Sequence, residues 1–275
     1  MALTLMYITN SVEIAKIAQE AGVDRIWVDM EWIGKDERQK GLDTVKSHHT
    51  IEDIKKLRPI INKSQLMVRI NPIHEGTCNE IEKTIESGAD VIMLPMFKTI
   101  KEVKYFLNCI KGRVTTILLI ETIEATQILD ELIAINGIDE FYIGLNDLSL
   151  AMKKNFMFDL LRDGVVDEIV NKLKITGKPY GFGGIARLNK GVVPSEYIIA
   201  EHYRLGSTRA ILSRSFCNAN KNSNLNEVQS LFIKGIKDIR NYEACCLKKS
   251  LKDFEKNKLK IRDLINEADK TIEKK

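Results

Sequence analysis

The chain has 275 residues, of which 44% are hydrophobic and 29% charged, so it is large enough to bury one large core or two small ones. The formal net charge of +4 comes from 42 basic and 38 acidic side chains, a balance too even to indicate nucleic acid or an anionic membrane as the main partner. The sequence shows neither a basic, apolar leader nor a run of roughly 18 uncharged apolar residues, so we expect no membrane span and a cytoplasmic location.

From the start to about residue 215, short β-branched or aliphatic runs alternate with amphipathic stretches of ten or more residues. This alternation is typical of a parallel sheet with helical crossovers. Eight such units match the size of a (β/α)8 TIM barrel, whereas a doubly wound sheet usually has fewer strands and a glycine fingerprint after the first. The predicted strands are LTLMYI (3–8), RIWVDM (25–30), LMVRI (66–70), DVIMLP (90–95), TTILLIE (115–121), EFYIGL (140–145), PYGFGGI (179–185) and RAILSR (209–214).

The C-terminal part of the chain is rich in lysine and reads as helix. We expect residues 1–222 to form the barrel core, and residues 223–275 to form the eighth barrel helix and a helical extension. Leu251, Phe254 and Leu259 recur at roughly helical steps in that extension. Two interpretations are open: the extension packs on another subunit of a homo-oligomer, or it is a solvated helix that frays.

Five cysteines are spread along the chain: Cys78, Cys109, Cys217, Cys245 and Cys246. They form neither a Cys-x-x-Cys pair nor a His/Cys pattern with metal-site spacing. We therefore expect most of them to be reduced thiols with a structural role.

Polar residues end several of the predicted strands, and in barrels the active site lies at the C-terminal ends of the strands. The candidates in chain order are Asp29, Glu31, Arg69, Asn71, Glu121, Asn146, Asp147, Arg187, Ser213 and Arg214.

Glu121 and Asp147 follow adjacent strands, which places two carboxylates side by side over the barrel mouth. Without a partner these like charges repel, and a divalent cation removes the conflict. Two carboxylates with no adjacent His or Cys favour Mg²⁺ or Mn²⁺ over zinc. Arg69 ends the third strand, and its fork of donors matches a carboxylate or an enolate oxygen, so the trio suits a small 2-keto acid. The alternative is a plain ion pair of Arg69 that caps the barrel.

Four motifs carry a family resemblance: RIN after the third strand, GADVIMLPM, IETIEA and IGLNDLS. Over roughly residues 20–215 the chain resembles the HpcH/HpaI aldolase and citrate lyase beta-subunit family of the phosphoenolpyruvate/pyruvate barrel superfamily. The resemblance implies that Glu121 and Asp147 bind Mg²⁺ or Mn²⁺ and that Arg69 contacts a pyruvyl group. It implies an aldolase that joins or releases an aldehyde through the enolate of pyruvate or a related 2-keto acid, and it implies a homo-oligomer.

The chain departs from this family after the second strand. Pyruvate aldolases of the family carry Asp-x-Glu-His there, with the histidine as the proton-transfer base, whereas this chain ends the motif with Trp32. Tryptophan has no basic nitrogen and cannot take that role. Our hypothesis is that one of the two histidines in the long following loop, His48 in preference to His49, folds back toward Asp29 and acts as acid and base. The alternative is that His49 and Thr50 only begin a helix, which Thr50 caps together with Asp53.

Basic residues near the predicted mouth suggest an anionic second substrate. Lys35 and Arg38 lie in the second loop and Arg187 follows the seventh strand, in a fold that often holds phosphate after strands seven and eight. We therefore predict that these three residues and Arg69 bind the substrates, a 2-keto acid and an aldehyde or phosphorylated acceptor.

Three other functions compete with a metal-dependent aldolase. A Schiff-base aldolase would use Lys98, the lysine nearest to a strand end. A citryl-CoA or malyl-CoA type lyase would share Glu121, Asp147 and Arg69. A catalytically silent barrel that binds a keto acid is consistent with Trp32, although it gives no reason to keep two adjacent carboxylates.

Overall fold

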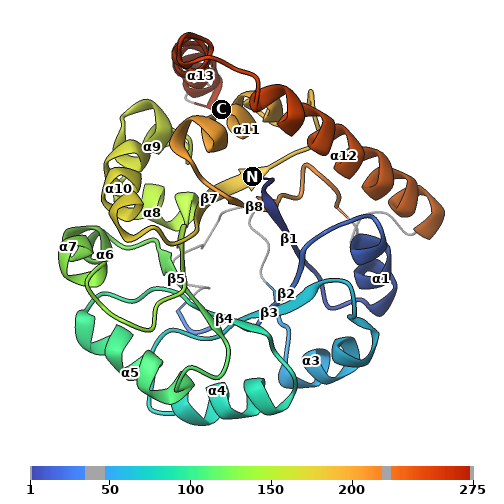
Figure 1. The fold of residues 1–275 in the computed structure, drawn as a ribbon, viewed down its shortest axis with the longest axis vertical. Helices are drawn as coiled ribbons and strands as arrows, with labels where there is room; N and C mark the ends of the chain where they lie inside the picture. The colour runs from blue at the N-terminus through green and yellow to red at the C-terminus, as the bar shows by residue number, and fades with distance from the viewer. Residues whose placement is uncertain (1, 35–46, 219–223, 273–275) are drawn as a thin grey trace.

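Eight parallel strands close into a barrel in which each strand pairs with the next in sequence and β8 pairs with β1 (Figure 1). The computed structural model describes residues 2–34, 47–218 and 224–272. All eight strands lie within or overlap the predicted runs, so the predicted (β/α)8 barrel is confirmed. The strands are β1 (Thr4–Ile8), β2 (Arg25–Asp29), β3 (Gln65–Arg69), β4 (Val91–Leu94), β5 (Thr115–Ile120), β6 (Glu140–Ile143), β7 (Tyr180–Ile185) and β8 (Arg209–Leu212).

Helices surround the barrel and cover its outer face (Figure 1). Polar caps define where several of them begin: the Ser11 hydroxyl accepts from the Ile14 N–H, and Thr99 and Glu102 form a capping box. No helix within the described ranges is both long and apolar enough to cross a membrane. The helices are α1 (Val12–Glu20), α3 (Ile51–Leu57), η1 (Arg58–Ile60), α4 (Thr77–Glu86), α5 (Ile100–Ile110), α6 (Ile123–Gln127), α7 (Leu129–Leu132), α8 (Leu145–Ala151), α9 (Asp159–Arg162), α10 (Val165–Leu173), η2 (Lys174–Thr176), α11 (Ser195–Leu205), α12 (Leu225–Cys246) and α13 (Leu251–Ile272).

The apolar core has two parts, one inside the barrel and one between the strands and the helices. Side chains alternate along each strand, so Trp27 of β2 points into the barrel, while Ile26 and Val28 pack toward the helices. Because both faces of the strands are buried, the strands read as nearly continuous apolar runs in the sequence. The buried residues of the inner part are Met6, Trp27, Met67, Val91, Met93, Ile117, Leu119 and Tyr142.

The N-terminal ends of the strands carry a hydrogen-bonded polar group that we call the floor cluster: the buried Arg25 and Glu140, the partly buried Arg209 and the exposed Gln65. Arg25 donates to both oxygens of Glu140 at 2.7 Å, and Arg209 donates to the same two oxygens at 2.9 and 2.8 Å. The Nε of Arg25 also donates to Gln65 at 2.8 Å. The single carboxylate therefore closes the bottom of the barrel by joining β6 to β2 and β8.

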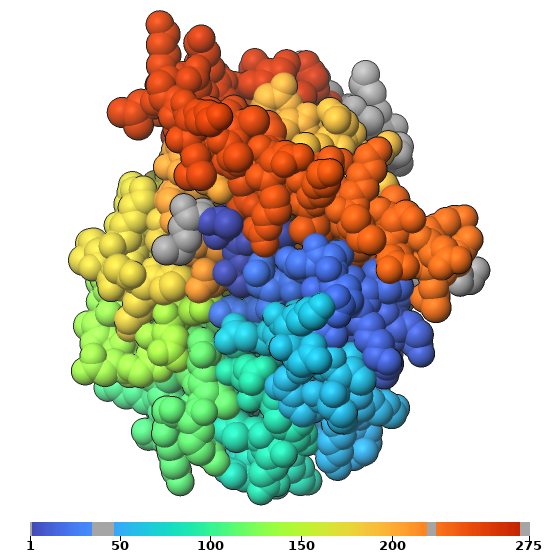
Figure 2. Space-filling model, turned by 45° about the vertical axis from the view of Figure 1, so that its right-hand side comes forward, coloured from blue at the N-terminus to red at the C-terminus, as the bar shows by residue number. Residues whose placement is uncertain are grey.

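Helix α12 completes the ring by packing against α1 and α11, and Figure 2 shows it in orange against the blue N-terminal segment. Its buried Glu243 accepts a hydrogen bond from the Leu3 N–H, and its Arg240 donates to the Leu3 carbonyl at 2.7 Å. These two bonds satisfy the N–H and C=O groups of Leu3, the residue just before β1.

The C-terminal helix α13 packs on its own chain, against α11 and α9 (Figure 1). Ile261 and Ile265 are buried in that contact, and the Asn257 amide donates to Glu201 at 2.8 Å. The extension is therefore held by the barrel itself, which neither sequence interpretation specified. Leu251 and Leu259 remain exposed on its outer side, and a role in a homo-oligomer stays a prediction.

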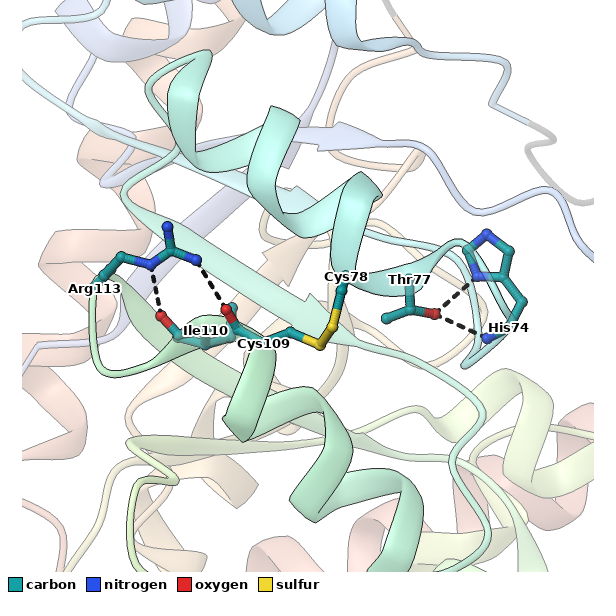
Figure 3. The surroundings of a disulfide bond; sticks show 6 residues. All are labelled: His74, Thr77, Cys78, Cys109, Ile110 and Arg113. Atoms are coloured by element: carbon teal, nitrogen blue, oxygen red, sulfur yellow. Dashed lines mark hydrogen bonds between the residues drawn. A yellow bond between two sulfur atoms is a disulfide. The ribbon is translucent and has the colours of Figure 1, made fainter.

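A disulfide between Cys78 and Cys109 joins the start of α4 to the end of α5 (Figure 3). The remaining cysteines, Cys217, Cys245 and Cys246, are free thiols, in line with the expectation for most of them. The pair lies 31 residues apart in sequence. A spacing of that length has no local signature, so only the packing of α4 on α5 reveals it.

Candidate active site

Arg69 and Asp29 lie opposite each other at the C-terminal ends of β3 and β2, where the strand register pairs them directly. The Arg69 guanidinium donates from Nε and Nη2 to the two Asp29 oxygens, each at 2.8 Å, in a bidentate pair. Its Nη2 also lies 3.2 Å from Glu31 Oε2. The guanidinium is further fixed 5.1 Å from the centre of the Trp27 ring below it.

Glu121 and Asp147 lie at the ends of β5 and β6 and line the same cavity at the barrel mouth. Glu121 comes directly after β5 and accepts a hydrogen bond from the Met96 N–H at 3.1 Å. Asp147 lies in the first turn of α8. Gly144 makes this approach possible, since a Cβ at that position would lie 2.7 Å from Glu121 Oε2.

These residues give the mouth an excess of negative charge. We call Asp29, Glu31, Glu121 and Asp147 the mouth carboxylates. Burial, followed by the charges of Asp147 and Glu31, raises the pKa of Glu121 well above its usual range, and Arg69 only partly opposes this. Burial disfavours the charge of Arg69, yet Asp29 and Glu31 outweigh it and raise the guanidinium pKa. Arg69 therefore stays charged, whereas no salt bridge within the described ranges pairs Glu121 with a cation.

The residues present fit a hard divalent cation. Glu121 is 2% exposed and its pKa is raised by Asp147, which is the arrangement that a shared cation relieves. Within the described residues no group of three or more His, Cys, Asp or Glu side chains forms a metal site. Glu121 and Asp147 would thus supply two oxygen ligands, with water or substrate oxygens completing the shell, as is common for Mg²⁺.

The mouth cavity has a volume of about 260 Å³ and holds the three strand-end residues together. The structure thereby brings Arg69, Glu121 and Asp147 to one space, with Asp29 at its edge. Its inner wall includes Tyr142, whose hydroxyl donates to the Gly183 carbonyl and accepts from the Ile211 N–H. Sequence reasoning missed Tyr142, although the alternation in EFYIGL places it on the inward face of β6.

The histidine hypothesis is corrected in one respect. His49, not His48, contacts Asp29: its Nδ1 accepts a hydrogen bond from the Asp29 N–H at 3.0 Å. His48 is exposed and lines a separate cavity beside Trp32. The alternative prediction for the segment also holds, because Thr50 begins α3 and its N–H donates to Asp53 at 2.8 Å. Helix initiation at Thr50 fixes which of the two histidines turns toward β2.

Asn71 holds the backbone that follows the second strand. Its side-chain oxygen accepts from the N–H groups of Trp32 and Ile33 at 3.0 and 3.1 Å. Its amide nitrogen donates to Glu80 of α4 at 2.8 Å, and its own N–H reaches the same oxygen at 3.2 Å. The Trp32 ring itself is 63% exposed. Asn71 therefore fixes the chain just after Glu31 and Asp29.

One of the predicted anion-binding residues, Arg187, is placed differently from the expectation. Arg187 is not among the residues that line the described mouth cavity: its stem runs past Gly235 of α12, 3.3 Å from where a Cβ there would lie. Arg214, two residues beyond β8, lines the mouth instead. Lys35 and Arg38 lie outside the described residues. Lys98 is half exposed and pairs with Glu124 at 3.2 Å, which does not suit a Schiff-base lysine.

Residues 3–177 match the family model for HpcH/HpaI aldolase/citrate lyase. A search of curated proteins gave no match. Solved structures share the fold at low identity. An HpcH/HpaI aldolase/citrate lyase family protein from Burkholderia cenocepacia J2315 is 13% identical with a TM-score of 0.62, covering 83% of this chain and 95% of its own. Citrate synthase SbnG is 15% identical with a TM-score of 0.61, and the match covers 83% of this chain and 94% of that one. Macrophomate synthase is 14% identical with a TM-score of 0.55, and the match covers 78% of this chain and 77% of that one.

Proposed function

The chain belongs to the HpcH/HpaI aldolase/citrate lyase family, and from this premise we propose that it is a carbon–carbon lyase that acts through the enolate of a 2-keto acid. The keto acid is pyruvate or a close relative, the cofactor is Mg²⁺ or Mn²⁺, and the second substrate is an aldehyde or a phosphorylated acceptor. The observation that carries the proposal is the convergence of Glu121, Asp147 and Arg69 on one cavity of about 260 Å³.

Each of these residues has a part that follows from its contacts. Glu121 and Asp147 would hold the cation, and the chemistry that it would supply is Lewis-acid stabilisation of the developing enolate. Arg69 uses Nε and Nη2 for Asp29 and Glu31, and within the described residues no hydrogen bond uses Nη1. The Nη1 donors thus serve a substrate carboxylate or an enolate oxygen.

Asp29 is a positioning residue in this scheme. Both of its oxygens are held by Arg69, and its backbone N–H is held by His49, so the carboxylate fixes the guanidinium in place. Because Trp32 replaces the family's histidine, proton transfer in this site uses water or one of the mouth carboxylates rather than an imidazole at that position.

The test is proton exchange at the methyl group of pyruvate, which reports enolate formation without knowledge of the acceptor. The protein is incubated with pyruvate and Mg²⁺ or Mn²⁺ in deuterated water, and the methyl signal is followed by NMR. We expect it to disappear with either metal and to persist after chelation. Metal and oxalate binding with no exchange on pyruvate, oxaloacetate or related keto acids would instead favour a silent keto-acid-binding barrel.

Two further measurements separate the competing chemistries. Borohydride reduction in the presence of pyruvate traps a Schiff base, and we expect no covalent adduct because Lys98 pairs with Glu124 and does not line the mouth cavity. Cleavage of malyl-CoA or citryl-CoA at a higher kcat/KM than that of free 4-hydroxy-2-oxo acids would assign the site to the CoA lyases of the family.

A further inference from the structure

The two cysteines of the disulfide between α4 and α5 differ in their access to solvent (Figure 3). Cys78 is the second residue of α4 and is exposed, whereas Cys109 lies in the last turn of α5 and is 6% exposed. Their Cα atoms are 5.2 Å apart, a separation at which two thiols join without movement of the backbone. A small thiol can therefore attack the bond at Cys78 while the protein stays folded.

The α5 side of the bond is held by contacts that do not involve sulfur. Arg113 donates from Nε to the Ile110 carbonyl at 3.0 Å and from Nη2 to the Cys109 carbonyl at 2.8 Å (Figure 3). Its Nη1 donates to Glu82 of α4 at 2.8 Å, in an exposed ion pair that contributes little to stability. The end of α5 thus keeps its geometry when the disulfide opens, and α4 is the side that responds.

The first turn of α4 also supports the mouth of the barrel from outside. Glu80 follows Cys78 by two residues and accepts from the Asn71 side-chain amide at 2.8 Å and from the Asn71 N–H at 3.2 Å. The side-chain oxygen of Asn71 accepts in turn from the N–H groups of Trp32 and Ile33. A continuous set of contacts therefore runs from the disulfide to the segment that follows Asp29 and Glu31.

Thr77 limits how far this turn can move when the bond opens. Its side chain is fully buried, and its hydroxyl oxygen accepts from the His74 N–H at 2.8 Å (Figure 3). Further along α4, Ile81 and Thr84 are fully buried as well. Opening of the disulfide therefore leaves α4 on the barrel and loosens its first turn, so the effect on the mouth is graded and is not an unfolding of the helix.

We propose that Cys78–Cys109 is a reversible thiol–disulfide exchange site for a small-molecule thiol couple, and that the bond controls how firmly α4 holds the segment after Asp29. The oxidised form is the more active one. The part that concerns activity rests on the proposed function, whereas the exchange chemistry and its effect on the backbone do not.

The exchange step is balanced by the couple itself. A small thiolate attacks the sulfur of Cys78, the bond between the two protein sulfurs breaks, and its electron pair leaves with the sulfur of Cys109, which takes a proton. A second small thiol attacks the mixed disulfide and releases Cys78 as a thiol together with a small disulfide. Two thiols are thus oxidised for each protein disulfide reduced, and the reverse reaction restores the bond.

The first experiment follows the bond without reference to activity. The folded protein is equilibrated with millimolar glutathione or with glutathione disulfide, then unfolded in an alkylating reagent and mapped by mass spectrometry. We expect Cys78 and Cys109 to be joined to each other after the disulfide treatment and both to be alkylated after the thiol treatment. The proposal is overturned if the two are joined after both treatments or alkylated after both, because the bond would then be fixed or absent.

The second experiment measures the effect on the mouth after the small thiols have been removed by desalting. Amide hydrogen exchange of the peptide that contains Trp32 and Ile33 should be about fivefold faster at these two N–H groups in the reduced protein. The kcat/KM for proton exchange on pyruvate should fall by more than about twofold. The fall should not exceed about tenfold, the loss expected when the contact between Asn71 and Glu80 is broken altogether.

Two serine variants locate the response. Cys78→Ser removes the exposed sulfur of the bond, so it should resemble the reduced wild type after either treatment in both measurements. Cys245→Ser is the matched control, because Cys245 is an exposed free thiol on α12, and it should keep the full difference between the two treatments. The wild-type comparison uses one unaltered chain, so it decides the matter even if a variant folds poorly.

The outcomes separate this inference from the proposed function. If neither form exchanges protons on any keto acid, the proposed function fails, and amide exchange at Trp32 and Ile33 still decides whether the bond acts on that segment. If protons are exchanged but both measurements are the same in the two forms, only the present inference is overturned. A response that persists in Cys78→Ser, or that disappears in Cys245→Ser, also overturns it, since another thiol would be responsible.

Discussion

The two ends of the barrel both bury charge, but they balance it differently. In the floor cluster two guanidinium groups surround one carboxylate, and all four N–H···O bonds are 2.7 to 2.9 Å long. At the mouth, Arg69 lies among four carboxylates and pairs closely with only two of them. The floor cluster is complete as it stands, whereas at the mouth the four carboxylates outnumber the two described guanidinium groups, Arg69 and Arg214.

This difference shows what each end does. Burying several like charges together is costly, and groups with perturbed pKa values gather at functional sites. The pKa values follow the same division. Burial alone would raise the pKa of Glu140, but the hydrogen bonds from Arg25 and Arg209 outweigh it and lower that pKa to about 2. At the mouth, burial and like charges raise the pKa of Glu121.

Removal of either of the two mouth carboxylates that we propose as cation ligands should have the largest effect on activity. Asp147→Asn and Glu121→Gln each take away a charged oxygen ligand, and we expect the rate of pyruvate proton exchange to fall at least about 10³-fold. Glu82→Gln is the matched control, because Glu82 is exposed on α4, pairs with Arg113, and lines neither the mouth cavity nor the cavity that Glu121 and Asp147 share with Lys98. Its rate should stay within about twofold of wild type. Equal losses in all three variants would contradict a specific cation site.

The floor cluster should respond in stability and not in chemistry. Glu140→Gln leaves two buried guanidinium groups without a counter-charge, so the free energy of unfolding should fall by roughly 3 kcal/mol at pH 7. Because the pKa of Glu140 is lowered in the folded state, its contribution is present above about pH 4.5 and is lost as the pH falls toward 2. Urea unfolding at pH 7 and pH 3 measures both effects, and the difference between variant and wild type should shrink at pH 3.

An exposed ion pair provides the control for that measurement. Glu20 pairs with Lys63 on the surface, and Glu20→Gln should cost less than about 1 kcal/mol at either pH. A loss of proton exchange in folded Glu140→Gln protein would break the division between the two ends, since it would couple the floor cluster to catalysis.

The sequence predicts the mouth better than the floor, and the reason is physical. Arg69 ends an apolar strand, Glu121 directly follows one, and Asp147 lies in the first helical turn after another, and the barrel geometry alone brings these positions together. Glu140 and Arg25 begin strands and meet across the barrel at a separation of 115 residues, which no local pattern reports. The residues that sequence reasoning misplaced, His48 and Arg187, lie in connections, where capping and helix packing decide the direction of a side chain.

Glu121 also allows a test of the mouth in the absence of metal. Its pKa is raised in the folded state, so the folded protein holds a proton that the unfolded chain releases, and stability falls as the pH rises above the usual value of 4.5. Glu121→Gln removes that penalty. We expect the metal-free variant to melt a few degrees above metal-free wild type at pH 8 and at the same temperature near pH 5. Mg²⁺ should then stabilise wild type and not the variant; identical melting of both at every pH would contradict the account.

The smallest effect is expected from the polar contact that supports the mouth from outside. Asn71→Ala frees the N–H groups of Trp32 and Ile33 and releases Glu80, so we expect kcat/KM for proton exchange to fall about tenfold. Asn71→Asp alone should be no better, because it places a second carboxylate against Glu80. Combined with Glu80→Gln it recreates an amide–carboxylate pair with the roles exchanged, keeps the acceptor for both N–H groups, and should recover most of the activity. Recovery of activity in the double variant would show that Asn71 acts by positioning the segment after Asp29, and not through packing in general. A double variant as slow as Asn71→Ala would show that the contact does not set the geometry of the mouth.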